Sequence, residues 1–154
     1  MSIFPTKILL ATDGSPDAQL AATTAADIAN STDSELHIVT VVGGLAWDME
    51  TQEVVDQLRQ RGRQVLDEQV KKIEETGGKV AQTHVRLVEE HRDRAIVDLA
   101  DELEVGLIVM GSRGLGGVRR ALMGSVSDSV VKHAHCPVMV VRREDRQKPV
   151  GGAS

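Results

Sequence analysis

Short apolar runs alternate with amphipathic segments along almost the whole chain, and this alternation is the strongest constraint on its fold. Five apolar runs have the length of strands, and the four segments between them repeat their apolar residues at helical spacing. Four strand–helix pairs closed by a fifth strand predict a mostly parallel sheet with helices on both faces. Because such crossovers are right-handed, the expected fold is α/β, a three-layer, doubly wound, Rossmann-like sandwich around a five-stranded parallel sheet.

Residues that typically begin or end helices and strands support these elements. The expected strands are residues 7–12, 36–42, 79–88, 105–110 and 137–141, and the expected helices are residues 16–30, 52–76, 92–104 and 125–135. Ser15-Pro16-Asp17 predicts a helix start, since serine caps, proline fits the first position and an acid suits the first turn. Gly77 is expected to end the second helix. Residues 1–142 should form one domain, followed by a flexible tail at 143–154.

Composition excludes several classes of function. The chain has 154 residues, enough for one domain with a stable core, and 18 basic against 23 acidic residues give a net charge of −5. An acidic chain with 1% aromatic residues is a poor candidate for binding nucleic acid. No apolar run is long enough to span a membrane, and no secretory signal is evident. The single cysteine, Cys136, cannot form an internal disulfide, so the expected location is the cytoplasm.

Two strands end in turn-forming residues at the same edge of the expected sheet. Thr12-Asp13-Gly14-Ser15 follows the first strand, and Gly111-Ser112-Arg113-Gly114 follows the fourth. Ligands of doubly wound sheets bind beyond the carboxyl ends of the strands, near the point where the strand order reverses. The sequence therefore predicts a ligand site at this edge.

The glycine-rich segment has two interpretations. Glycines let backbone N–H groups approach an anion, and Ser125 opens a helix whose free amides favour a phosphate. Alternatively, the segment is a surface loop and Ser125-Val126-Ser127-Asp128 is a capping box. A Walker A loop is excluded, because Met123 precedes Gly124-Ser125 where that motif needs lysine. The segment does not match a dinucleotide fingerprint, which should follow the first strand rather than the fourth.

The motif Gly111-x2-Gly114-x9-Gly124-Ser125, together with Ala11-Thr12-Asp13-Gly14-Ser15, resembles the ATP-binding branch of the universal stress protein family. The run Gly124-Ser125-Val126-Ser127 and the approach to the last strand, His135-Cys136-Pro137-Val138, are also typical of that family. The resemblance extends from about Lys7 to Arg142. It implies a fold similar to that of the adenine nucleotide α-hydrolases.

The resemblance also implies a set of nucleotide-binding residues. They are Ala11, Thr12, Asp13, Val41, Gly111, Ser112, Arg113, Gly114, Leu115, Gly116, Gly117, Gly124, Ser125, Val126 and Ser127. Asp13 would accept hydrogen bonds from ribose or adenine, and the backbone of Val41 would contact the adenine edge. Residues 111–117 would surround ribose and phosphates, and residues 125–127 would bind the phosphates through amides and hydroxyls. The implied ligand is ATP, with Mg²⁺ on its phosphates. Residues 89–92 depart from the Gly-x-Pro turn common in the family.

Some of these residues also have structural interpretations. Asp13 precedes a glycine and could simply cap a turn. His133, His135 and Cys136 lie close together, but no fourth metal ligand is evident, so no metal site is expected in the protein itself. Cys136 is expected to be a small buried residue at the start of the last strand.

The last strand suggests a partner. Residues 137–141 are apolar on both faces, which an exposed edge strand should not be, and the resemblance implies a homodimer through this strand. The implied function is nucleotide-dependent stress response or signalling without a committed reaction. The alternatives are a slow ATPase or a protein that phosphorylates itself on Ser125 or Ser127, a nucleotide-free adaptor, and a binder of cyclic AMP.

Overall fold

The computed structural model describes residues 2–44, 51–112 and 123–142. Its elements are β1 (Lys7–Ala11), α1 (Pro16–Thr32), β2 (Glu35–Val42), α2 (Gln52–Glu75), β3 (Gln82–Leu87), α3 (Arg92–Leu103), β4 (Leu107–Gly111), α4 (Ser125–His133) and β5 (Val138–Val141). Their strict alternation confirms the α/β fold expected from the apolar pattern. The expected tail at 143–154 lies outside the described residues.

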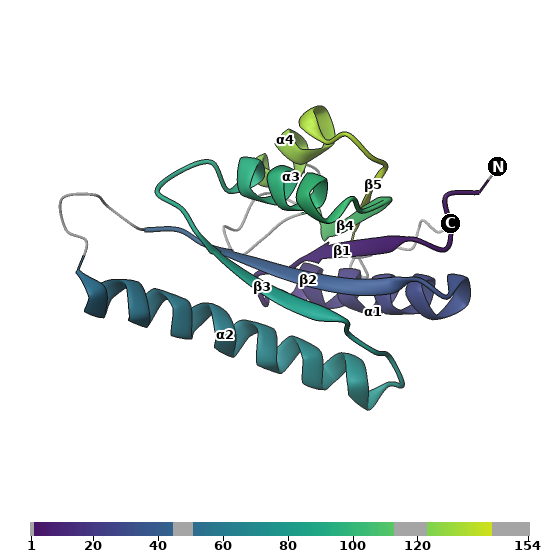
Figure 1. Ribbon diagram of the computed structural model, residues 1–154, viewed down its shortest axis with the longest axis horizontal. Helices are drawn as coiled ribbons and strands as arrows, with labels where there is room; N and C mark the ends of the chain where they lie inside the picture. The colour runs from purple at the N-terminus through teal and green to yellow at the C-terminus, as the bar shows by residue number, and fades with distance from the viewer. Residues whose placement is uncertain (1, 45–50, 113–122, 143–154) are drawn as a thin grey trace, which may run out of the picture.

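The five strands form one parallel sheet in the order β3-β2-β1-β4-β5. Helices α1 and α2 cover one face of this sheet, and α3 and α4 cover the other, which makes three layers (Figure 1). The chain runs outward from β1 through β2 to β3 and then returns to the far side of β1 as β4. The order of the strands therefore reverses between β1 and β4.

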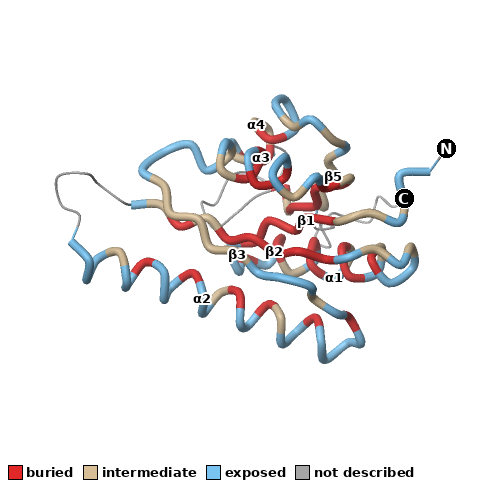
Figure 2. Tube along the Cα trace, in the orientation of Figure 1, coloured by how far each residue is buried: buried red, intermediate tan, exposed pale blue. Residues whose placement is uncertain are grey.

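Two apolar clusters, one on each face, hold the layers together, and Figure 2 shows the buried residues concentrated along the inner strands. Alternate residues of β1 point to opposite clusters: Leu10 lies in one and Leu9 in the other. Helix α1 contributes a stripe of buried alanines, namely Ala18, Ala21, Ala22, Ala25, Ala26 and Ala29. Because alanine is small, this stripe lets α1 pack closely against the sheet.

Several elements begin or end at the residues expected from the sequence. The Ser15 hydroxyl accepts a hydrogen bond from the backbone N–H of Ala18, which caps α1. Gly77 has a φ of +91° directly after the last turn of α2, the left-handed backbone that glycine adopts without a steric penalty. Other ends differ by a few residues. Strand β3 begins at Gln82, and α4 ends at His133 because the backbone of Ala134 is already extended.

Within the described ranges, no helix combines the length and the apolarity that crossing a bilayer requires.

Candidate functional site

A cavity of about 460 Å³ opens at the carboxyl edge of the sheet, around the ends of β1, β2 and β4. Its lining consists of Ala11, Thr12, Asp13, Ala18, Val39, Thr40, Val41, Val42, Gly43, Arg61, Gly62, Val65, Arg92, Ile96, Met110, Gly111, Gly124, Ser125, Val126 and Ser127. It includes the point between β1 and β4 where the strand order reverses, which is where doubly wound sheets bind ligands.

The cavity brings together many of the residues that the sequence singled out. Nine of them line it: Ala11, Thr12, Asp13, Val41, Gly111, Gly124, Ser125, Val126 and Ser127. Ser112 is buried behind the cavity wall and is absent from the lining. Arg113, Gly114, Leu115, Gly116 and Gly117 lie outside the described residues.

The turn after β1 is fixed by side chains at its two ends. The hydroxyl of Thr12 donates a 2.8 Å hydrogen bond to Oε1 of Gln69 on α2 and accepts one from the backbone N–H of Gly14. Oδ1 of Asp13 accepts a hydrogen bond from the backbone N–H of Ser15. Asp13 therefore performs the turn-capping role anticipated as its structural alternative, yet it is also exposed and lines the cavity.

The end of β4 lies against the first turn of α1. A methyl group placed on Gly111 would come within 2.9–3.0 Å of the backbone of Asp17, so only glycine fits without moving the helix. The hydroxyl of Ser112 donates to Oδ2 of Asp17, and both residues are buried. Gly111 is thus needed for close packing, in addition to any role toward a ligand.

Helix α4 starts beside the cavity without a side-chain cap. Its N-cap is Gly124, and no side chain in the described ranges accepts from its first turn, so the predicted alternative of a capping box at Ser125 is wrong. The Ser127 hydroxyl donates instead to the carbonyl oxygen of Gly111, at 2.7 Å. The backbone N–H groups at the start of a helix have no partner within it, and the helix dipole makes this end positive. The start of α4 is therefore well suited to an anion.

Sequence reasoning missed two cations and two glycines of the lining. Arg61 and Gly62 come from α2, Arg92 is the first residue of α3, and Gly43 follows β2. The unusual residues at 89–92 were a signal at Arg92, whereas nothing in the apolar pattern of α2 indicated Arg61. With Asp13 as the acidic residue of the described lining, these two arginines make the cavity positive by one charge.

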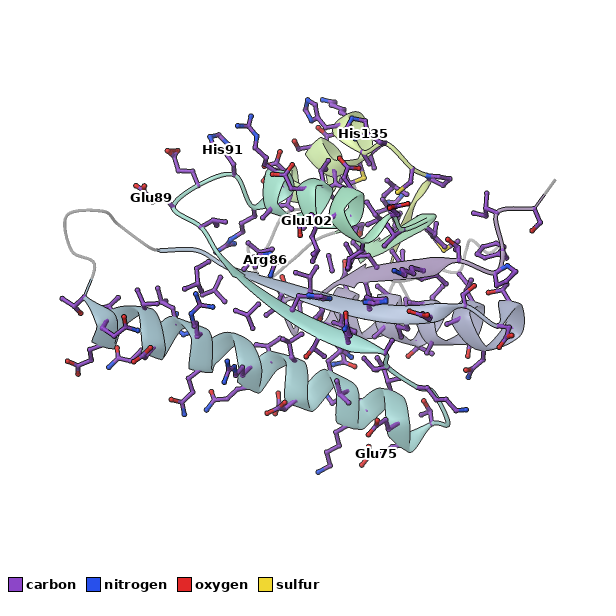
Figure 3. The ribbon with its side chains drawn as sticks, in the orientation of Figure 1. Glu75, Arg86, Glu89, His91, Glu102 and His135 are labelled. Carbon is purple, nitrogen blue, oxygen red and sulfur yellow. The ribbon has the colours of Figure 1, made fainter. Side chains whose placement is uncertain are left out.

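Several titratable groups lie away from this cavity. His37 on β2 and His84 on β3 stack with ring centroids 5.8 Å apart, and burial lowers the pKa of His84, helped by Arg86 and His37. Figure 3 shows Arg86 on β3 and Glu102 on α3, whose charged groups approach to 3.5 Å.

His133 is the last residue of α4, and His135 and Cys136 lie between it and the start of β5. Cys136 is half-buried, and burial raises the pKa of its thiol. His135 pairs with Asp101, while His133 contacts the backbone carbonyl of Ser129. In the described part of the chain, no three His, Cys, Asp or Glu side chains are arranged to hold a metal ion.

The sequence profile of the Universal stress protein family matches residues 5–142. The chain belongs to the universal stress protein family. One member, universal stress protein MJ0531 of Methanocaldococcus jannaschii, is 35% identical over 146 residues, which cover 92% of this chain and 84% of the relative.

Solved members of the family share the fold. Universal stress protein UspA from Lactobacillus plantarum superposes with a TM-score of 0.75 at 28% identity, covering 89% of this chain and 97% of that one. A universal stress protein in complex with cAMP superposes with a TM-score of 0.67 at 26% identity, covering 90% and 97%. These likenesses agree with the sheet order and layers described above.

Proposed function

We propose that this universal stress protein binds ATP in the cavity at the carboxyl edge of its sheet. The observation that carries the proposal is the position of the uncapped start of α4, which borders the cavity at Ser125, Val126 and Ser127. A helix start that offers free amides to a cavity is a ready site for phosphate. The relative solved with cAMP supports an adenine nucleotide as the ligand.

The rest of the cavity suits the nucleoside part of the ligand. Its volume of about 460 Å³ falls within the usual range for small-molecule sites, roughly 300–1,000 Å³. Val39, Val41 and Ile96 supply an apolar wall at the end of β2 and on α3. In this arrangement the adenine lies against that wall, Asp13 accepts hydrogen bonds from the ribose or the adenine, and the phosphates extend toward α4.

A divalent ion fits this site as a companion of the ligand. The described lining contains one carboxylate, Asp13, and one of its oxygens already accepts from the N–H of Ser15. The phosphates themselves would therefore supply most ligands of a Mg²⁺ ion, which prefers oxygen and retains waters. The ion would neutralise the charge of the triphosphate.

Nucleotide binding without a committed reaction is the activity proposed for this site. Apart from Asp13, the described lining holds no Asp, Glu, His, Lys or Cys that could activate water or a serine hydroxyl. The hydroxyl of Ser127 is engaged with the carbonyl oxygen of Gly111. The proposed role is in cytoplasmic stress response or signalling, with the binding of ATP as the signal.

A homodimer through β5 completes the proposal. Strand β5 pairs with β4 on one side and is the last strand of the sheet on the other. Met139 is 37% exposed on this edge strand, and its neighbours Val138 and Val140 are also apolar. An apolar edge strand invites pairing, and a second copy of the chain would cover it.

Titration calorimetry tests the choice of ligand. Purified protein is titrated with ATP, AMP and cyclic AMP, each with and without Mg²⁺, after mass spectrometry has identified any nucleotide that copurifies. We expect saturable binding of one ATP per chain, tighter than that of AMP or cyclic AMP. Tighter binding of cyclic AMP would replace ATP as the ligand, and no binding of any of the three would refute the proposal. Phosphate release far above background would show an enzyme.

A further inference from the structure

Two arginines reach the cavity from opposite sides of the sheet. Arg61 lies on α2 and Arg92 on α3, and these helices cover different faces (Figure 1). Both residues are exposed, and both line the cavity. Arg86, by contrast, has Glu102 as an ionic partner. Among the described residues, neither Arg61 nor Arg92 forms a salt bridge, so their charges are available to a ligand.

The position of Arg92 is set by its contact with Gly43. A methyl group placed on Gly43 would lie 2.8 Å from Nη2 of Arg92 and 3.2 Å from its Nε. The guanidinium group therefore lies directly over Gly43, at the end of β2, in space that exists because this residue has no side chain. From there it forms part of the cavity wall.

Arg92 also lies close to the start of α4. A second cavity, of about 350 Å³, shares Gly43, Arg92, Ser125 and Val126 with the first one. The hydroxyl of Ser129 on α4 donates a 2.7 Å hydrogen bond to Oδ2 of Asp93, which joins the first turns of α3 and α4. The charge of Arg92 and the positive end of α4 thus border the same space.

The second cavity is also lined by Glu89, Glu90 and Asp93, whereas none of these three carboxylates lines the first cavity. Glu89 and His91 lie on the loop before α3, and both are exposed (Figure 3). The carboxylate of Asp93 is held by Ser129, and that hydrogen bond is the main reason why the pKa of Asp93 is lowered.

On the other side, Gly62 brings Arg61 to the rim. A methyl group on Gly62 would lie 2.8 Å from Cγ1 of Val85 and 3.2 Å from Cγ2 of Val42, so this glycine lets α2 lie close against the sheet. The preceding residue, Arg61, is thereby placed at the cavity. Its charge faces the site from the α1–α2 layer, opposite Arg92.

We propose that Arg61 and Arg92 form a clamp that closes on the phosphates from both faces of the sheet and selects ligands by their negative charge. This inference rests on the proposed binding of a nucleotide and names what decides between nucleotides. Guanidinium groups bind phosphate oxygens through paired hydrogen bonds. The clamp favours a triphosphate over a monophosphate, and a monophosphate over the uncharged nucleoside.

Calorimetric titration of the full chain with ATP and with adenosine tests the clamp. Arg61→Ala and Arg92→Ala are each expected to weaken ATP binding about tenfold, the effect of losing one charge-assisted contact, and to leave adenosine binding unchanged. The dependence of ATP affinity on salt should also become shallower in both variants. Arg63→Ala and Arg94→Ala remove the same charge from exposed neighbours on the same helices that line neither cavity, and they should bind ATP normally.

Gly43→Ala supplies an independent check without removing a charge. Its methyl group should displace the guanidinium of Arg92, so ATP binding should weaken as in Arg92→Ala, and combining the two substitutions should add little. Equal losses for ATP and adenosine, or ATP affinity unchanged in both arginine variants, would overturn the clamp while leaving nucleotide binding intact. If the unaltered protein binds no ATP, the proposed function itself fails.

Discussion

The hydroxyl of Ser127 donates a 2.7 Å hydrogen bond to the carbonyl oxygen of Gly111, which joins the first turn of α4 to the end of β4. Both residues line the cavity, and they are 16 positions apart in the chain. The bond holds the start of α4 at the point where the strand order reverses. The proposed phosphate site therefore depends on a contact between two of its own members.

Ser127→Ala removes this bond. We expect the free energy of unfolding to fall by about 1 kcal/mol, because a partly buried hydrogen bond is lost. ATP binding should weaken as well, since α4 is no longer held in place. Ser125→Ala is the matched control: the Ser125 side chain is exposed, so its loss should change stability by less than about 0.5 kcal/mol. Urea unfolding of the two variants measures the difference, and equal stabilities would contradict the role of Ser127.

Asp13 stabilises the turn after β1, and we propose that it also contacts the ligand. Two substitutions separate these roles. Asp13→Asn keeps an oxygen that can accept from the N–H of Ser15, whereas Asp13→Ala removes it. We expect Asn to retain stability but to weaken ATP binding several-fold, and Ala to lose both. Calorimetry and urea unfolding report on the two properties separately. Full ATP affinity in Asp13→Asn would assign Asp13 to the turn alone.

Thr12, the residue after β1, and Gln69 on α2 form a buried polar pair. Gln69 is 1% exposed, so Thr12→Val leaves its Oε1 without this donor. The substitution also removes the acceptor of the Gly14 N–H, and the two losses together should cost about 1–3 kcal/mol of unfolding free energy. The double variant Thr12→Val/Gln69→Leu replaces both partners with apolar groups. It should recover the part of the loss that comes from the unpaired Gln69, but not the part that comes from the Gly14 N–H. If the double variant loses as much unfolding free energy in urea unfolding as the two single variants added together, the two side chains do not interact.

Stability should decline as the pH falls below about 6.5, the ordinary pKa of histidine. In the folded protein the pKa of His84 is lowered, first by burial and then by Arg86 and His37, while Glu102 opposes them. Between the lowered value and 6.5 the unfolded chain takes up the proton more readily, so acid favours unfolding. Above 6.5 this contribution is constant. Urea unfolding from pH 8 to pH 5 should therefore show a smaller decline in His84→Gln than in the unaltered chain.

The predicted dimer is tested by light scattering. The chain mass is 16.6 kDa, and we expect a species of twice that mass at micromolar concentration. Met139→Lys places a charge on the exposed edge of β5 and should shift the protein to the monomer without unfolding it. If the unaltered protein is a monomer, the proposed dimer is wrong, but the proposal for the nucleotide site is unaffected.

The fold was predictable because its signals are local. Apolar runs and helical spacing identify each element, and Gly77 or Ser15 mark ends that depend on a few neighbouring residues. The site was predictable where it consists of strand ends, since parallel strands that end together place Asp13 and Gly111 at one edge.

The features of the site that could not be predicted from the sequence depend on contacts between distant elements. Gln69 is fully buried on α2, but a polar residue breaks the apolar pattern and so goes unnoticed. Nothing in the sequence pattern indicates Arg61, and the departure at residues 89–92 does not show that Arg92 reaches the cavity. Packing at Gly62 and Gly43 brings the two arginines there. Small residues that permit a close approach are visible only when both surfaces are known.

A crystal structure of the protein grown with millimolar ATP and Mg²⁺ shows directly whether the cavity holds the nucleotide. We expect the triphosphate within about 3 Å of the backbone nitrogens of Ser125 and Val126, with the adenine against Val41. An empty cavity, or a nucleotide bound elsewhere on the molecule, would contradict it.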